Sequence, residues 1–121
     1  MPTACSAGPR RIVRVQDLAD DPAVFAAYEE AHLPGYTPAA VLDVQRRHGI
    51  LDLEIFRYTD RLVMIMTVSD DFDPAGLDRE SATVPELVDW HRRMARLQRR
   101  PAKAEQDWPE AKLVFRQSDR P

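Results

Sequence analysis

Two consecutive apolar runs near the middle of the chain constrain its fold more than any other feature. Residues 50–58 (ILDLEIFRY) alternate between apolar and polar side chains, whereas residues 61–68 (RLVMIMTV) are apolar on both faces. Alternation with a period of two is typical of a strand with two distinct faces, and an all-apolar run is typical of a central strand. The short connection Thr59-Asp60 therefore predicts a β-hairpin.

One predicted strand and two predicted helices precede the hairpin. Residues 11–17 (RIVRVQD) alternate and are rich in β-branched side chains, which favours a strand. The sequence Asp20-Asp21-Pro22 supplies a capping carboxylate and a first-turn proline, and so predicts a helix over residues 22–33. By the same reasoning Thr37-Pro38 predicts a second helix that runs to His48.

Three further segments follow the hairpin. Residues 69–81 are acidic and are predicted to be irregular. Thr83 and Glu86 have the spacing of a capping box, which predicts a helix that continues to about Arg99. Residues 112–116 (KLVFR) are predicted to form the last strand.

This order of elements predicts an α+β fold. A β-α-β-β-α-β chain of the ferredoxin-like type forms a four-stranded antiparallel sheet with its helices on one face. The other face would carry either Val63 and Ile65 or Met64 and Met66, and an apolar surface of that kind favours a second copy of the chain as cover. We therefore expect a homodimer. The expected single domain spans residues 11–117, between a flexible tail (1–10) and a frayed end (118–121).

Composition excludes several classes of function. The 121 residues carry a net charge of −3, so no basic excess favours nucleic acid as a partner. No apolar stretch is long enough for a membrane helix, and we expect a cytoplasmic protein without membrane partners. The single cysteine, Cys5, excludes an intrachain disulfide, and the four glycines do not form a phosphate-binding loop.

Several segments, taken in order, resemble the L-rhamnose mutarotase family. They are Asp20-Asp21-Pro22, Tyr28-x-x-x-His32, Gly49-Ile50-x-Asp52-x-Glu54-Ile55-Phe56-Arg57, Arg61-Leu62-Val63-Met64-Ile65-Met66, Asp70-Asp71-Phe72-Asp73, Trp90-x-x-x-Met94 and Trp108. The hairpin and the Asp-Asp-Phe segment are similar to the L-fucose mutarotase branch. The resemblance implies a dimeric α+β barrel of ferredoxin-like subunits. It also implies an isomerase, an aldose 1-epimerase that interconverts the α and β anomers of a 6-deoxyhexose such as L-fucose or L-rhamnose.

Mutarotation needs a base for the anomeric hydroxyl and an acid for the ring oxygen, but it requires neither a metal nor a redox cofactor. An imidazole suits both roles because its ordinary pKa is near 6.5. His32, which matches the histidine of the family, is the candidate proton shuttle, and Tyr28 is its candidate partner one turn earlier. The other candidate sugar-binding residues are Trp90, Trp108, Tyr36, Asp52 and Glu54.

Each of these residues also has a purely structural interpretation, such as core packing for Trp90 or solvation for Asp52 and Glu54. A metal site built from His32, His48 and His91 is not predicted, because their spacing matches no metal motif. The chain departs from the family after His32, where Tyr36 or Pro38 and an alanine replace a Trp-Pro-Glu segment. Other functions therefore remain open: a cofactor-free monooxygenase, a haem-handling protein, or a sugar-binding dimer without activity.

Overall fold

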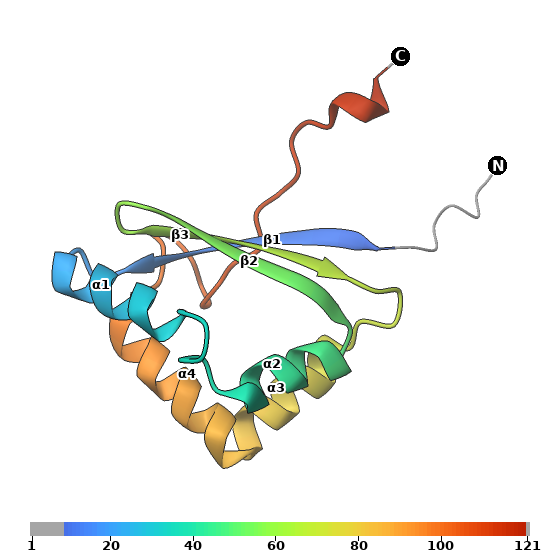
Figure 1. The fold of residues 1–121 in the computed structure, drawn as a ribbon. Helices are drawn as coiled ribbons and strands as arrows, with labels where there is room; N and C mark the ends of the chain where they lie inside the picture. Colours follow the sequence, from blue (N-terminus) through green and yellow to red (C-terminus); the bar gives the residue numbers. More distant parts are fainter. Residues whose placement is uncertain (1–8, 121) are drawn as a thin grey trace.

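A curled antiparallel sheet with helices on one side forms the body of the protein (Figure 1). The computed structural model describes residues 9–120, so Cys5 and most of the predicted tail lie outside the described residues. The four strands are β1 (Arg10–Leu18), β2 (Ile50–Tyr58), β3 (Arg61–Val68) and β4 (Gln98–Arg99). They lie in the order β2-β3-β1-β4 with antiparallel pairing. This arrangement confirms the predicted ferredoxin-like fold.

The hairpin has the bounds that the sequence indicates. β2 and β3 pair from Ile50 opposite Val68 to Tyr58 opposite Arg61. Thr59 turns the chain between the two strands with a φ of 50°. β3 pairs on its other edge with β1, so it lies in the middle of the sheet, as its two apolar faces predict.

Within residues 9–120, four α-helices cover one face of the sheet: α1 (Pro22–Ala31), α2 (Ala39–Arg47), α3 (Pro74–Thr83) and α4 (Pro85–Leu97). The start of α1 is as predicted, because the Asp21 carboxylate accepts a hydrogen bond from the Ala23 N–H at 2.9 Å. Among the described residues, none of the helices is long and apolar enough to cross a membrane.

The acidic stretch 69–81, predicted to be irregular, instead contains most of α3. The Asp73 carboxylate accepts a hydrogen bond from the Gly76 N–H at 3.0 Å, and Pro74 lies in the first turn. This is the same Asp-Pro start that opens α1. The prediction was wrong because high polarity does not prevent a capped helix from forming when it packs on its neighbours.

Neither predicted threonine cap forms. Thr83 is the last residue of α3, where its hydroxyl donates to the Arg79 carbonyl at 2.8 Å, and α4 begins at Pro85 without a side-chain cap bond. The Thr37 hydroxyl donates to the Ala31 carbonyl at 3.0 Å and closes the turn between α1 and α2. In both cases a helix carbonyl already satisfies the hydroxyl.

The last strand is not where the sequence predicts it. Residues 112–116 pair with no strand within the described part of the chain, and the fourth strand is the two-residue β4 directly after α4. Only Glu110, just before that segment, makes an isolated bridge to Arg14 of β1. Beyond it the chain leads away from the helix-free side of the sheet to a short 3₁₀ turn, Gln117–Asp119 (Figure 1).

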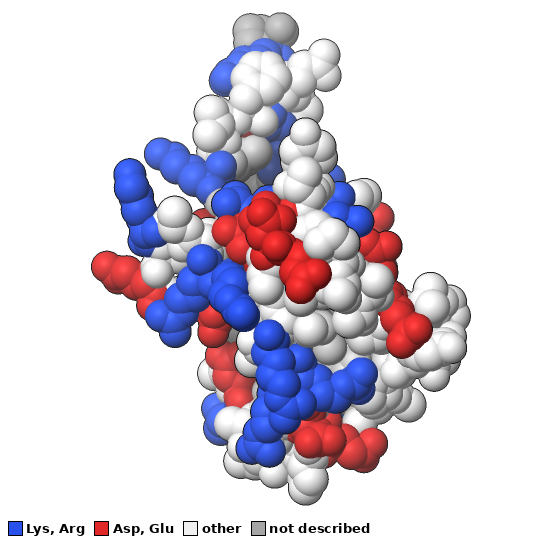
Figure 2. All heavy atoms as spheres, turned by 90° about the vertical axis from the view of Figure 1, so that its left-hand side faces the viewer, with Lys and Arg blue, Asp and Glu red and all other residues white. Residues whose placement is uncertain are grey.

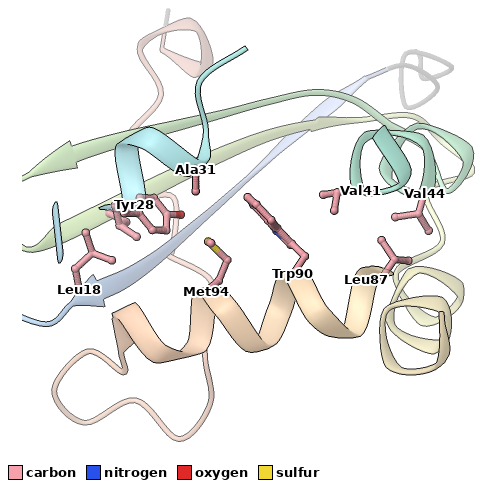
Figure 3. Packing of buried hydrophobic residues seen from close by; sticks show 9 residues of the cluster. Leu18, Tyr28, Ala31, Val41, Val44, Leu87, Trp90 and Met94 are labelled. Atoms are coloured by element: carbon pink, nitrogen blue, oxygen red, sulfur yellow. The ribbon is translucent and has the colours of Figure 1, made fainter. Parts of the chain in front are cut away.

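Most of the core lies between the sheet and the helices. One cluster contains Leu18 and Leu62 of the sheet and helix residues such as Tyr28, Trp90 and Met94. All of these except Leu62 are labelled in Figure 3. A second cluster packs at the other end of the sheet: Ile12, Ile50, Met66 and Val68. Met66 therefore faces the helices, and its neighbour Ile65 belongs to the opposite face.

Candidate active site

A cavity of about 580 Å³ lies between the sheet and helices α1, α2 and α4. Aliphatic side chains such as Val41, Leu62 and Met94 form part of its wall. The remainder is aromatic or polar, which gives a largely apolar pocket with a few groups able to bind hydroxyls. Four of the residues predicted from the sequence line it together: Tyr28, His32, Trp90 and Trp108.

His32 follows the last turn of α1, and its ring is fixed by that helix. Nδ1 lies 2.7 Å from the Tyr28 carbonyl oxygen. Because a carbonyl only accepts, Nδ1 carries the hydrogen and donates it, which leaves Nε2 with the lone pair in the neutral ring. Ring packing supports the same orientation: the His32 centroid lies 4.3 Å from that of Tyr28 and 5.2 Å from that of Trp90.

The surroundings of His32 favour its neutral form. Burial lowers the pKa of the imidazole below its ordinary value of 6.5. The hydrogen bond to the Tyr28 carbonyl opposes this shift, whereas the nearby Arg93 charge adds to it. At neutral pH the ring is therefore ready to accept a proton on Nε2.

Tyr28 lies one turn before His32 and is almost completely buried, with 4 % of its surface exposed. Burial raises the pKa of its phenol to about 12, although a side-chain hydrogen bond with Gln98 opposes the shift. The hydroxyl is consequently a neutral donor over the physiological range. Gln98 belongs to β4, the last strand, which the sequence predicted at a different position. This strand therefore contributes directly to the site.

The two tryptophans approach the cavity from different segments. Trp90 projects from α4 into the core, and the Arg93 guanidinium lies 5.4 Å from its ring centroid. Trp108 lies in the segment before Glu110 and contacts the edge of the same core cluster. Both therefore combine packing with a position on the cavity wall.

Three predicted site residues are not brought into this cavity. Asp52 and Glu54 are exposed and lie opposite Thr67 and Ile65, on the face of the sheet away from the helices. Tyr36 is 59 % exposed in the connection between α1 and α2. None of these three residues lines the cavity that contains His32.

Sequence analysis missed other residues of the site. Gln45 of α2 and His91 of α4 line the cavity, as does Asp107 beside Trp108. A second cavity of about 240 Å³ shares Gln45, His91 and Trp108 with the first and also reaches Arg14. A signal for Arg14 was present, because it interrupts the short apolar stretch Ile12-Val13-Arg14-Val15 of β1.

The charge around the site is mixed. At the cavity rim Arg57 forms an ion pair with Glu29 at 2.6 Å, and its guanidinium lies 4.7 Å from the Phe25 ring centroid. Figure 2 shows basic and acidic side chains interspersed over this side of the molecule, without a field of one sign. Such a surface does not select for polyanions.

The histidines do not form a metal centre in the part of the chain that the structure describes, where no group of three or more His, Cys, Asp or Glu side chains is placed to hold an ion. His48 is engaged elsewhere: Nε2 contacts the Glu80 carboxylate and Nδ1 lies 3.6 Å from that of Asp73. These two contacts connect the end of α2 to both ends of α3.

Comparison with known proteins places this arrangement in a family. A solved structure of similar fold is that of tetracenomycin F2 cyclase from Streptomyces glaucescens, with a TM-score of 0.53, 18 % identity, and coverage of 88 % of this chain and 95 % of the cyclase. The L-fucose mutarotase of Xanthomonas campestris pv. campestris is 40 % identical over 112 residues, which is 91 % of this chain and 90 % of the relative. A sequence model described as L-rhamnose mutarotase matches residues 11–117. The chain therefore belongs to the L-rhamnose mutarotase family of sugar isomerases.

Proposed function

We propose that the chain catalyses mutarotation of a 6-deoxyhexose, with L-fucose ahead of L-rhamnose, and that His32 transfers the proton. The observation that carries this proposal is the contact of His32 Nδ1 with the Tyr28 carbonyl oxygen at 2.7 Å, from which the tautomer of His32 is inferred. Its Nδ1–H is bound to the Tyr28 carbonyl, so the basic Nε2 remains for a sugar in the cavity. The preference for L-fucose rests on the 40 % identical relative, which is an L-fucose mutarotase.

The reaction breaks and re-forms one carbon–oxygen bond. Nε2 of His32 takes the proton from the anomeric hydroxyl, the C1–O1 bond becomes a carbonyl, and the bond from C1 to the ring oxygen breaks. The neutral phenol of Tyr28 donates its proton to the ring oxygen as this bond breaks, which leaves an open-chain sugar with a hydroxyl there, a protonated His32 and a Tyr28 phenolate. Rotation about the C1–C2 bond and the reverse proton transfers then close the ring as the other anomer.

The remaining walls supply binding groups. Trp90 and Trp108 offer aromatic faces to the C–H side of the sugar, and Gln45 and His91 offer hydrogen-bond partners for its hydroxyls. The proposal assigns these contacts to residues of the cavity rather than to Asp52 and Glu54. The substrate is thus a single small sugar bound between the sheet and the helices.

The working unit in this proposal is a homodimer. Apolar side chains are exposed on the helix-free face of the sheet, with Phe56 53 % and Tyr58 80 % exposed. Three more follow in the terminal segment, Leu113, Val114 and Phe115, with exposures of 59 %, 87 % and 61 %. A second copy that covers these groups would remove a large apolar area from water.

Saturation-transfer NMR on an equilibrium mixture of sugar anomers tests the activity. We expect the protein to accelerate exchange between the α and β signals of L-fucose, and to a lesser extent those of L-rhamnose. No acceleration with any deoxyhexose would contradict the proposal. Stabilisation of the protein against heat by the sugar, without faster exchange, would instead identify a sugar-binding dimer.

A further inference from the structure

The helix-facing side of β1 carries two polar side chains where a sheet that packs on helices normally has apolar ones. Inward positions along the strand are Ile12, Arg14, Gln16 and Leu18, and the first and last belong to the core. Polar groups in such positions lose their hydration and need partners within the protein. Both find these partners in the segment around Trp108.

Gln16 has no exposed surface, and both ends of its amide are used. Nε2 donates to an oxygen of the Asp107 carboxylate at 3.1 Å, and Oε1 accepts from the Trp108 N–H at 3.3 Å. A buried amide with both ends paired fixes the segment that it binds, because any displacement would leave polar atoms without partners.

Arg14 binds the other backbone polar group of Trp108, its carbonyl oxygen. One of its Nη atoms donates to the Trp108 carbonyl at 3.3 Å. Its Nε is buried without a hydrogen-bond partner, and no carboxylate of the described residues forms an ion pair with its guanidinium. A charge in this setting contributes little to stability by itself, so stability alone does not explain its contact with Trp108.

Trp108 needs such restraint because its backbone is in the left-handed region, with a φ of 53°. A tryptophan in that conformation is strained and persists only where its surroundings determine it. Attachment of the segment to the sheet does not require the two side chains. The backbone already attaches it through Val15 N–H to Pro109 O at 3.1 Å and Ala111 N–H to Val13 O at 2.8 Å.

We propose that Gln16 and Arg14 are positioning residues that hold Trp108 in its strained conformation as a wall of the sugar site. This inference rests on the proposed function. Trp108 lines both the 580 Å³ cavity and the neighbouring 240 Å³ cavity. Its position therefore determines the shape of the sugar site where the two cavities adjoin. Gln16 and Arg14 act on sugar binding through Trp108 and not by touching the reacting atoms.

A double-mutant cycle on the full-length protein tests this. Gln16→Met keeps the length of the side chain but removes both hydrogen bonds. We expect it to raise KM for anomer exchange of L-fucose about tenfold with kcat nearly unchanged, since misplacement of a binding wall weakens binding more than the proton transfer. Trp108→Ala should raise KM by a similar factor, and the double variant should be no worse than Trp108→Ala alone. If the rise in KM of the double variant equals the product of the rises in the two single variants, the proposal is overturned. An unchanged KM in Gln16→Met would overturn it as well.

Arg14→Met should act in the same direction, with Arg14→Lys restoring part of the loss because an ammonium still donates to the Trp108 carbonyl. Arg11→Met, which alters an exposed residue of the same strand, is the matched control and should leave KM unchanged. If Gln16→Met does not fold, Arg14→Met, which removes the hydrogen bond to the Trp108 carbonyl, enters the same cycle with Trp108→Ala.

A fluorine label separates failure of this inference from failure of the proposed function. In protein labelled with 5-fluorotryptophan, the resonance of Trp108 is assigned as the one that Trp108→Phe removes. We expect Gln16→Met to shift or broaden that resonance and to leave that of Trp90 in place. If the protein catalyses no exchange but Trp108 moves in this way, the function is wrong and the positioning is right. An unmoved Trp108 resonance would overturn the positioning whatever the activity.

Discussion

At the scale of single residues, the orientation of His32 comes from ordinary helix geometry. A residue just after a helix can reach the carbonyl four positions earlier, and here that carbonyl belongs to Tyr28. One local contact thus selects the tautomer, and the packing of the ring between Tyr28 and Trp90 fixes its plane. Sequence analysis predicted this pair from their spacing of four residues. It could not predict the tautomer, which depends on where the carbonyl points.

Replacement of His32 by alanine removes the proposed base. We expect the rate of anomer exchange to fall by about 10²–10⁴-fold, the usual contribution of general acid–base catalysis. The fold should survive, because the side chain is only partly buried. Leu33→Ala, which changes the exposed next residue, is the control and should retain the wild-type rate. Equal rates for His32→Ala and wild type would remove His32 from the mechanism.

Activity should depend on pH through the lowered pKa of His32. Burial disfavours the imidazolium, so the neutral base persists below pH 6.5 and kcat/KM declines only as the pH falls further. The free energy of unfolding changes in the same direction. A histidine whose pKa is depressed in the folded state binds fewer protons there than in the unfolded state, so its contribution to stability is lost as the pH falls.

Arg93 provides a sharper form of this test, because its charge is one cause of the depression. Arg93→Gln should move the midpoint of the kcat/KM profile to higher pH, whereas Arg92→Gln at the exposed neighbouring position should move it less. A midpoint in Arg93→Gln at or below that of the wild type would show that the charge does not act on His32.

At the scale of secondary structure, locally determined elements were predictable and those that depend on distant partners were not. The hairpin was correct at both ends because alternation and a tight turn lie within residues 50–68. β4 was missed because two residues carry no periodic pattern and are strands only through pairing with β1. Residues 112–116 have strand-like side chains but no partner strand in the described chain.

The overlooked helix α3 leads to a prediction about stability. Asp73→Ala removes the cap of that helix, a hydrogen bond of 3.0 Å to the Gly76 N–H. We expect the free energy of unfolding, measured by urea titration, to decrease by about 0.5–2 kcal/mol. Asp89→Ala at an exposed position within α4 should change it by no more than about 0.5 kcal/mol. Equal values for the two variants would contradict the role of Asp73 as a cap.

At the scale of the whole molecule, the helix-facing side of the sheet is partly polar and the helix-free side is partly apolar. β1 directs Arg14 and Gln16 toward the helices, whereas Val13 and Val15 lie on the opposite face. An alternating strand alone does not say which set faces the core, so the sequence left this orientation open. The arrangement makes sense if the helix side contains a polar site and the other side a partner.

This interpretation predicts a dimer in solution. Sedimentation analysis should give a mass of two chains, and Ile65→Asp on the helix-free face should shift the equilibrium toward the monomer, because it would bury a charge without a partner. Leu33→Asp on the helix side should leave the mass unchanged. A wild-type protein that is monomeric at all concentrations would contradict the expected assembly.

The candidate site was also predictable only in part. His32, Tyr28, Trp90 and Trp108 could be found because their elements bring them to the helix-covered face, as the resemblance to the family implied. The sequence could not show that Asp52 and Glu54 point away from the cavity. Their orientation depends on which face of β2 meets the helices, and an irregularity between Ile50 and Asp52 alters that register.

The most direct test of the account compares wild-type protein with His32→Ala by saturation transfer between the α and β signals of L-fucose near pH 7. We expect rapid exchange with the wild type and loss of nearly all acceleration in the variant, with unchanged circular dichroism. Wild-type protein without acceleration on L-fucose or L-rhamnose, or a variant as fast as the wild type, would contradict it.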